Sequence, residues 1–270
     1  NNKIGFSDLT SNKDIESLLF KGNEPVNLRV DAEVYGLGFA IKHKSWALAI
    51  TSKINGKLDA VDIDTKLGDA LLNSGLNSVL GSTSIKNNYN QRLTGTTWGE
   101  VGFTLSKNLL DKEKYKVNVG ATFKLLFPGS YSNLGLDKFN GTINNVGSQV
   151  YLNNTTANLN IAYSGSLANS LSNFEDYTKS VFGGLNGFSG DIGINFQWKD
   201  EPETNPKKNK NRYKFNAGLA LRNMGSITFN DDDNYNTNYT LNIQPTIANP
   251  QGLNLNQFEN IDNLQQIETI

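Results

Sequence analysis

Five charged residues in this sequence are placed where they could act together: Glu100, Lys124, Asp191, Lys214 and Arg222. Each lies two positions from a Gly, Ala, Asn or Thr, in a segment where large apolar residues take the alternate positions. Charges of opposite sign on one face of a β-sheet can pair across strands. We therefore expect these residues to form ion pairs with one another on the sheet face that they share. Such pairs more often stabilise a structure than serve the transport of a substrate.

Other chemistry finds little support in the sequence. The only histidine, His43, falls in a short charged turn, so no Ser-His-Asp set can form around a buried imidazole. The acidic run Asn230–Tyr235 could gather Ca²⁺, but it lacks the glycine and the closing glutamate of an EF-hand, which favours a solvated loop. Phosphate-binding and dinucleotide-binding loops are missing too. We therefore predict no catalytic residue, no metal site and no cofactor, and we do not expect an enzyme.

The elements that must position the charges are β-strands, because period-two patterns run along the chain. In "GLGFAIKHKSWALAITSKI" large residues fall on every second position up to a charged turn near His43–Lys44, and the alternation resumes after it. This pattern predicts a hairpin of strands Leu28–Lys42 and Ser45–Ile54. Similar alternation predicts strands near 98–110, 115–127, 155–165, 187–199 and 212–223. One or two weaker strands are expected near Tyr239–Ile247.

The connections between these strands are expected to alternate in length. Short or charged turns follow Ile41, Leu110 and Trp198, whereas long connections are predicted at about 59–96, 128–155 and 165–187 and after Asn223. The first long connection contains a leucine-rich segment, 65–80, that predicts an amphipathic helix. Weaker helical patterns occur at 166–182 and 255–267. Long decorated connections at one end and short turns at the other are typical of outer-membrane barrels.

Periodicity alone leaves two interpretations of the large apolar residues. In a soluble β-sandwich they point into a core, whereas in a membrane barrel they point into lipid and the small polar face lines a lumen. Strands of about ten residues suit a tilted membrane span, the polar face carries few charges, and aromatic residues lie near strand ends, as at a membrane interface. These features favour the membrane.

The membrane interpretation assigns a direction to each alternating position. The five charged residues named above are predicted to face the lumen. The residues predicted to face lipid are Leu37, Phe39, Ile41, Trp46, Leu48, Ile50, Val101, Phe103, Leu105, Val119, Phe123, Ile192, Ile194, Phe196, Phe215 and Leu219.

Composition excludes several classes of protein. The chain of 270 residues is 37% hydrophobic and 19% charged, and no stretch approaches the ~18 apolar residues of a membrane helix. A net charge of −1 implies no bulk attraction to nucleic acid, so we expect no nucleic-acid partner. The absence of cysteine excludes disulfides and thiolate metal sites.

Three blocks of the sequence resemble a known protein family. They are "TWGEVGFTLSKNLLDKEKYKVNVGATFKLLF", "YGLGFAIKHKSWALAITSKINGKLDAVDID" and "RYKFNAGLALRNMGSITF". Together they resemble a Bacteroidota-type family of outer-membrane β-barrels of unassigned function. That family is distantly similar to long-chain fatty-acid-transporter and type IX secretion barrels. Many of its members carry a C-terminal OmpA-type domain that binds peptidoglycan.

The resemblance implies the fold class and the cellular location. We expect a transmembrane, antiparallel, up-and-down β-barrel in the bacterial outer membrane, with long, partly helical extracellular loops and short periplasmic turns. Residues 1–270 are interpreted as one barrel domain that is incomplete, since about seven strands are clear and a full barrel of twelve to fourteen needs strands beyond Ile270. An OmpA-type periplasmic domain could follow.

The function expected from this resemblance is structural or envelope-organising. The chain would anchor peptidoglycan through a further C-terminal domain or act as an accessory subunit of a larger outer-membrane complex. Its expected partners are outer-membrane lipid, other outer-membrane proteins and peptidoglycan. The alternative is a porin-like transporter of small apolar or amphipathic substrates, with the helical loops gating the path.

Overall fold

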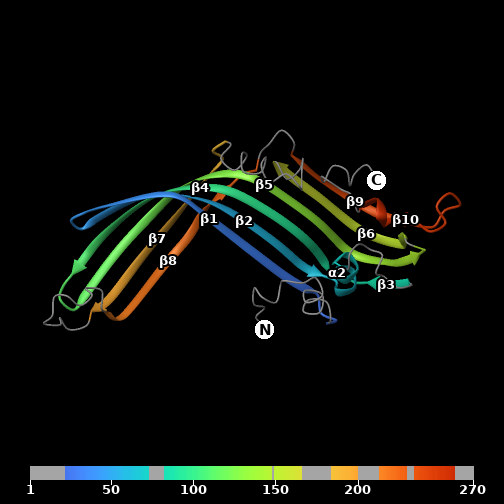
Figure 1. The fold of residues 1–270 in the computed structure, drawn as a ribbon, viewed down its shortest axis with the longest axis horizontal. Helices are drawn as coiled ribbons and strands as arrows, with labels where there is room; N and C mark the ends of the chain where they lie inside the picture. The colour runs from blue at the N-terminus through green and yellow to red at the C-terminus, as the bar shows by residue number, and fades with distance from the viewer. Residues whose placement is uncertain are drawn as a thin grey trace.

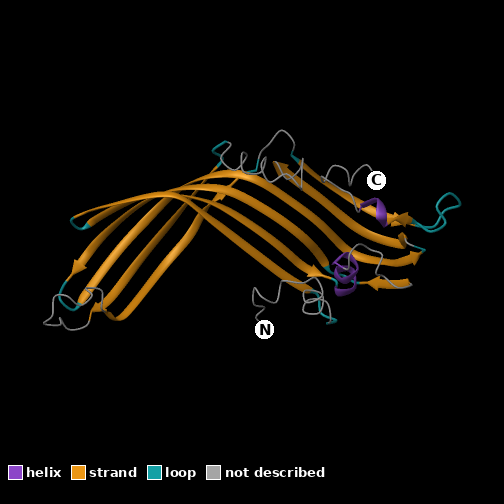
Figure 2. Cartoon of the chain, viewed as in Figure 1, coloured by secondary structure: helices purple, strands orange, loops and turns teal. Residues whose placement is uncertain are grey.

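The computed structural model describes residues 22–72, 82–147, 149–165, 184–199, 213–229 and 234–258. Over these ranges the chain is almost entirely antiparallel β-sheet, with helical turns only at one end (Figure 2). The fold class is therefore all-β, as the period-two patterns predicted. The helices in the described part of the chain are too short or too polar to cross a membrane.

The elements follow one another along the chain with these bounds. They are β1 (Val26–His43), β2 (Trp46–Ile63), α2 (Thr65–Leu72), β3 (Ser82–Lys86), β4 (Asn90–Asp111), β5 (Tyr115–Val146), β6 (Gln149–Gly165), β7 (Gly187–Lys199), β8 (Tyr213–Ile227), β9 (Tyr235–Ile243), β10 (Leu253–Asn254) and the 3₁₀-helix η3 (Leu255–Phe258).

The strands form one arched sheet built on the long strand β5 (Figure 1). In one half of the sheet, six strands lie side by side in the order β1, β2, β4, β5, β7 and β8. In the other half, β6 and β9 replace β7 and β8, while β3 and β10 add short edges. The turns joining β1 to β2 and β4 to β5 lie at the end of the six-strand half, which we call the short-turn end (Figure 1).

The sheet divides at a β-bulge in β5. Residues up to Leu126 pair with β7, and residues from Ser130 onward pair with β6 on the same edge. The register against β4 slips at this point, because Trp98 faces Pro128 whereas the preceding residue faces Ser130. The extra residue is Gly129, and the bulge accommodates a proline, which has no N–H for a regular ladder.

The described sheet is open, since neither β1 nor β8 has a partner strand along its outer edge. The short turns predicted after Ile41 and Leu110 are confirmed, whereas the connection after Trp198 lies almost entirely outside the described residues. β7 ends beside the β4–β5 turn, where the Lys199 N–H donates to the Lys114 carbonyl at 2.8 Å. The long connection predicted at 128–155 was wrong. That stretch is β5 and β6 joined by a tight turn at Gly147, whose φ is +67°. Its strands are rich in Gly, Asn and Thr, so they look like loop by composition.

The predicted helix at 65–80 is present as α2 over its described part. Asp64 caps it, since its Oδ1 accepts the Lys66 and Leu67 N–H groups at 3.0 and 3.3 Å. The helical segment predicted at 166–182, most of that at 255–267 and most of the acidic run at 230–235 lie outside the described residues. The weak strand predicted near Tyr239 is β9.

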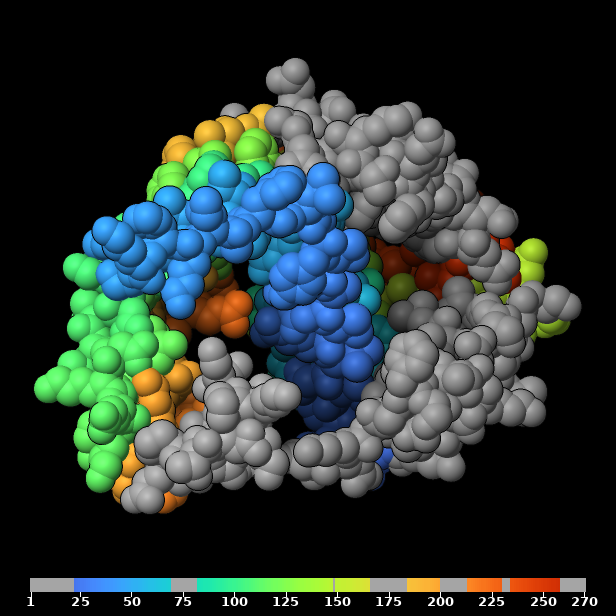
Figure 3. All heavy atoms as spheres, turned by 60° about the vertical axis from the view of Figure 1, so that its left-hand side comes forward, coloured from blue at the N-terminus to red at the C-terminus, as the bar shows by residue number. Residues whose placement is uncertain are grey.

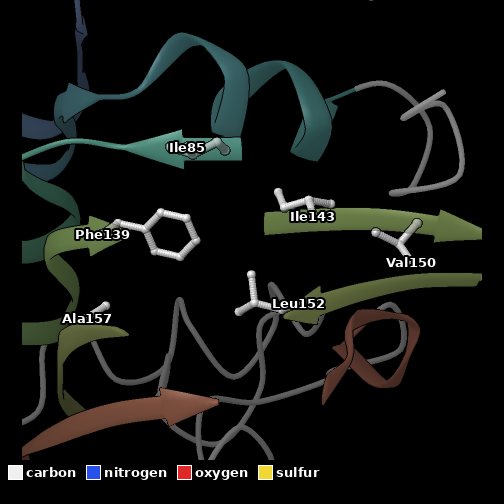
Figure 4. Close-up of a cluster of buried hydrophobic side chains, with 6 residues drawn as sticks. All are labelled: Ile85, Phe139, Ile143, Val150, Leu152 and Ala157. Atoms are coloured by element: carbon white, nitrogen blue, oxygen red, sulfur yellow. The ribbon is translucent and has the colours of Figure 1, made fainter. Parts of the chain in front are cut away.

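A conventional hydrophobic core lies only in the half of the sheet away from the short-turn end (Figure 4). It gathers residues of β3, β5 and β6 and is covered in part by Leu67 of α2 and Leu255 of η3. Ile143 and Val150 are almost completely buried. The members are Ile85, Phe139, Ile143, Val150, Leu152 and Ala157. Among the described residues, the six-strand half has no comparable core, and its large apolar side chains are mostly exposed.

Candidate functional site

The six-strand half of the sheet exposes its large apolar residues on one face. One row crosses all six strands without a gap, because each of its members is the direct cross-strand neighbour of the next. The row is Ile41, Leu48, Leu105, Ala121, Ile192 and Leu221. A second row, four strands wide, is Phe39, Ile50, Phe103 and Phe123. We call the face that carries these rows the apolar band.

The residues predicted to face lipid belong to this band. Leu37 and Leu219, on the two edge strands, are 81% and 73% exposed, and Val101 and Val119 are half-buried. The other twelve of the sixteen residues are exposed as well. A contiguous exposed apolar surface of this kind marks a contact with lipid or with another protein.

Aromatic side chains lie at the border of the band toward the short-turn end. The Lys107 ammonium lies 4.6 Å from the ring centre of Trp46, a cation–π contact. The Phe196 ring lies 6.0 Å from Tyr115 and 6.4 Å from Phe215, measured between ring centres. Two other aromatic residues near predicted strand ends, Trp98 and Tyr163, do not belong to this border of the band. Trp98 shares the face of Glu100, because both are even-numbered positions of β4, and Tyr163 is buried.

The opposite face carries an ion-pair network centred on Lys124. Its Nζ lies 2.8 Å from Asp191 Oδ2 and 3.7 Å from Glu100 Oε1, and its side chain is 3% exposed. Lys124 Nζ also donates to Asn223 Oδ1 at 2.8 Å. The lysine therefore joins two acids that come from different strands, and a charge so deeply buried requires such partners.

The network extends across the sheet through Lys53. Its Nζ lies 3.8 Å from Glu100 Oε2 and 3.2 Å from Glu33 Oε1. At the other end Arg222 of β8 lies opposite Asp191 of β7. Signs therefore alternate over β1, β2, β4, β5, β7 and β8, with one charged residue from each strand: Glu33, Lys53, Glu100, Lys124, Asp191 and Arg222.

The sheet curls toward the face that carries this network. On this face the side chains of Lys124 and Glu100 are only 3% and 9% exposed, whereas the apolar band on the other face is exposed, as expected for the inner and outer surfaces of a curved sheet. Figure 3 shows a hollow between the blue residues of β1 and β2 and the green and orange residues of β5 and β8. The ion-pair network therefore lies on the concave side.

A β-bulge in β8 completes the network. Leu221 faces Ile192 and Met224 faces Gly190, so Arg222 and Asn223 together face the single residue Asp191. The Asn223 N–H donates to Asp191 Oδ1 at 2.7 Å, and Asn223 has a φ of +58°. The bulge thus brings a backbone donor to the Asp191 carboxylate and places the Asn223 amide oxygen where it accepts from Lys124.

Four of the five charged residues predicted to face the lumen belong to this network. Lys214 does not, because it lies eight residues before Arg222 in β8, about 26 Å along the strand. Lys53 was missed although the parity of β2 indicates its face. Glu33 was missed because a bulge between Tyr35 and Gly38 inserts one residue into β1. Odd-numbered residues before the bulge therefore lie on the opposite face from odd-numbered residues after it.

A groove of about 440 Å³ lies beside the network on the same face. Gly120, Gly193 and Ala220 form much of its floor, and the Thr104 and Thr122 hydroxyls lie 2.8 Å apart along it. Arg222 is at its margin. The groove offers hydroxyl and backbone groups but no paired general acid and nucleophile, and no metal-binding cluster of His, Asp or Glu occurs among the described residues.

The sheet defines an all-β protein with an apolar face and an ion-paired face. The chain belongs to a family of unknown function, DUF5723, whose model matches residues 1–269. No curated protein and no solved structure matches the chain.

Proposed function

We propose that this chain forms the wall of an antiparallel β-barrel in the bacterial outer membrane, with a structural or envelope-organising role. The observation that carries the proposal is the apolar band, six strands wide, on the reverse of a face where the charges are paired with one another. Lipid is the environment that suits such a band, since a sheet in water would cover it.

The dimensions of the six-strand half support a membrane span. In β5 the stretch that pairs with β7, Tyr115–Leu126, has twelve residues, and a tilted span needs about 9–11. The buried core around Ile143 lies beyond this stretch, where a soluble environment is expected. We place the short-turn end in the periplasm and that core outside the cell.

The two open edges require partners in a membrane, because unpaired backbone groups are costly in lipid. We propose that further strands close the wall between β8 and β1. Other outer-membrane proteins, and peptidoglycan bound through an additional OmpA-type domain, are the partners that this role implies. The ion pairs that Lys53 and Lys124 form with Glu33, Glu100 and Asp191 favour a structural interior over an ion pathway.

Transport of small apolar or amphipathic substrates is the second candidate function. The groove beside Arg222 favours it, because its floor is made of small residues on the proposed lumen face. Conductance across planar bilayers, or uptake of an acyl-chain probe into vesicles, separates the two roles. A structural wall gives neither.

The membrane proposal is tested with a pair of neighbouring substitutions. Leu48→Arg puts a charge on the apolar band, and Ala49→Arg puts the same charge on the opposite face. We expect Leu48→Arg to lower the free energy of unfolding in detergent or vesicles by about 2–4 kcal/mol, and Ala49→Arg to cost less. Fractionation should place the protein in the outer membrane, with heat-modifiable migration on gels. A protein that is soluble without detergent and equally tolerant of both substitutions is not a barrel.

A further inference from the structure

The two ends of the six-strand half differ in charge. At the short-turn end, the bases among the described residues are Lys42, Lys44, Lys107, Lys112, Lys114, Lys116, Lys199 and Lys214. The described acids there are Asp111 and Glu113. Residues 200–212, which link β7 to β8, add three acids and four bases by sequence, so they do not offset this excess.

Beyond the ion-pair network in the other direction, the charges balance. The described bases there are Arg29, Lys57, Lys66, Lys86, Arg92 and Lys138, and the described acids are Glu24, Asp31, Asp59, Asp62, Asp64 and Asp137. Several of these pair with each other, as Arg29 does with Asp31 and Lys57 with Asp59. The network between the two ends is neutral. The positive excess is therefore confined to the short-turn end.

Several lysines at the short-turn end have no acidic partner within the described part of the chain. Among the described residues, the one ion pair there joins Lys199 to Asp111. Lys42, Lys44 and Lys114 are exposed and form no ion pair within the described structure. The excess positive charge therefore faces the surroundings.

The position of these lysines relative to the apolar band indicates their partner. Lys107 lies on the band itself, between its cross-strand neighbours Trp46 and Val119, at the border where the aromatic side chains gather. Lys44 follows one strand end, and Lys114 lies in the next turn. Cations that adjoin an aromatic border of an apolar surface lie at the level of lipid headgroups.

We propose that the short-turn end binds the headgroups of anionic phospholipids in the leaflet that it meets. This inference rests on the proposed membrane function and adds the lipid class. Lysine ammonium groups near an anionic surface attract it, and the attraction falls within a Debye length as salt rises. The lysines would surround the band with headgroup contacts at one leaflet only, which also fixes the depth of the barrel in the bilayer.

The test measures which lipid surrounds the folded protein. The full chain is folded into phosphatidylcholine vesicles that contain a fraction of brominated phosphatidylglycerol or brominated phosphatidylcholine, and quenching of tryptophan fluorescence gives the relative binding constant. Trp46 and Trp198 lie at the relevant border. At about 50 mM salt we expect a preference of at least about threefold for the anionic lipid, falling toward one at about 0.5 M salt.

Two matched triple variants decide whether the short-turn end is responsible. Replacing Lys42, Lys44 and Lys114 by Gln should reduce the preference to about one. Replacing Lys66, Lys86 and Arg92 by Gln removes equal charge at the other end and should leave the preference unchanged. The inference would be overturned if both variants lost the preference for anionic lipid equally, or if the parent protein showed no such preference. The membrane proposal would stand in either case.

Two further outcomes have separate meanings. Abolition of the preference by about 10 mM inorganic phosphate at constant ionic strength would show a site for free phosphate and overturn the lipid assignment. Failure of the parent protein to insert into any vesicle would overturn the membrane proposal and the inference together. Insertion without preference overturns the inference alone.

Discussion

Lys124 is the residue whose removal should affect the six-strand half most. Its ammonium lies 2.8 Å from Asp191 Oδ2 and 3.7 Å from Glu100 Oε1, and its side chain is 3% exposed. Lys124→Met keeps the length and the apolar stem of the side chain but removes the charge. Two acids, on the strands that flank β5, then lose the cation that lies between them.

The size of the effect follows from these distances. At an effective dielectric constant of about 20, unit charges attract by about 6 kcal/mol at 2.8 Å and about 4.5 kcal/mol at 3.7 Å. Desolvation offsets much of this attraction, and removing one partner of a buried pair typically costs about 3–5 kcal/mol. We expect Lys124→Met to lower the free energy of unfolding by that amount.

Lys53 provides the matched control in the same network. Its ammonium lies 3.2 Å from Glu33, but the side chains of Lys53 and Glu33 are 13% and 42% exposed. Solvent screens such a pair, which contributes about 1 kcal/mol or less. Glu100, 3.8 Å from Lys53, keeps Lys124 as a partner at 3.7 Å when Lys53 is replaced. Urea unfolding of the detergent-folded protein, followed by tryptophan fluorescence and gel migration, gives both values from the shift in midpoint.

A double variant separates an unpaired buried charge from a simple loss of packing. Lys124→Met combined with Asp191→Leu removes both members of the closest pair, and replacing a buried pair by apolar residues is often neutral. The double variant should therefore be more stable than Lys124→Met alone. If Lys124→Met and Lys53→Met differ by less than about 0.5 kcal/mol, the network does not stabilise the sheet in the way described.

Three other perturbations test separate parts of the fold. Gly129→Ala places a Cβ 2.7–3.0 Å from the facing strand and should cost about 1–3 kcal/mol in urea unfolding, whereas Gly184→Ala, with open space around it, should be neutral. Ile143→Ala, at 1% exposure, should cost about 2–5 kcal/mol, and limited proteolysis should show the loss in the core half while the apolar band stays protected. The hydrogen bond from Lys199 lowers the pKa of Asp111, so this carboxylate stabilises the fold above its ordinary pKa and the contribution disappears as pH falls. Asp111→Asn should therefore reduce stability slightly at neutral pH, and its difference from the parent should shrink as pH falls below about 4 and through the lowered pKa of Asp111; a difference that persists in strong acid contradicts this account.

The strands that the sequence predicted best are those with a strict apolar alternation. Leu48 and Phe103 mark their faces plainly, because every second position is small or polar. The strand around Ile143 was taken for a loop, since alternation is weak where a strand is rich in Asn, Gly and Thr. Composition identifies such a strand poorly when its stability comes from pairing and local burial.

The sequence predicted only some residues of the ion-pair network, because bulges change which face a residue occupies. Glu100 and Lys124 follow from parity within regular strands, but Glu33 lies before a bulge that shifts the parity by one. The bulge that brings Asn223 and Arg222 to Asp191 has no signal in the sequence, since an asparagine at positive φ is one of many asparagines in the chain. Pairing partners depend on register, which one sequence does not determine.

The length of β5 has a mechanical consequence for the whole chain. Its 32 residues extend about 105 Å at ~3.3 Å per residue, and its pairing with β4 continues through Leu126 to Asp137. β5 thus belongs to both the apolar band and the buried core, and β4 runs beside it from the band as far as Asp137, so the two halves of the sheet are joined by unbroken strands and not by a linker. A force applied to the half of the sheet that holds the core would be transmitted to the apolar band through the backbone hydrogen bonds between β4 and β5.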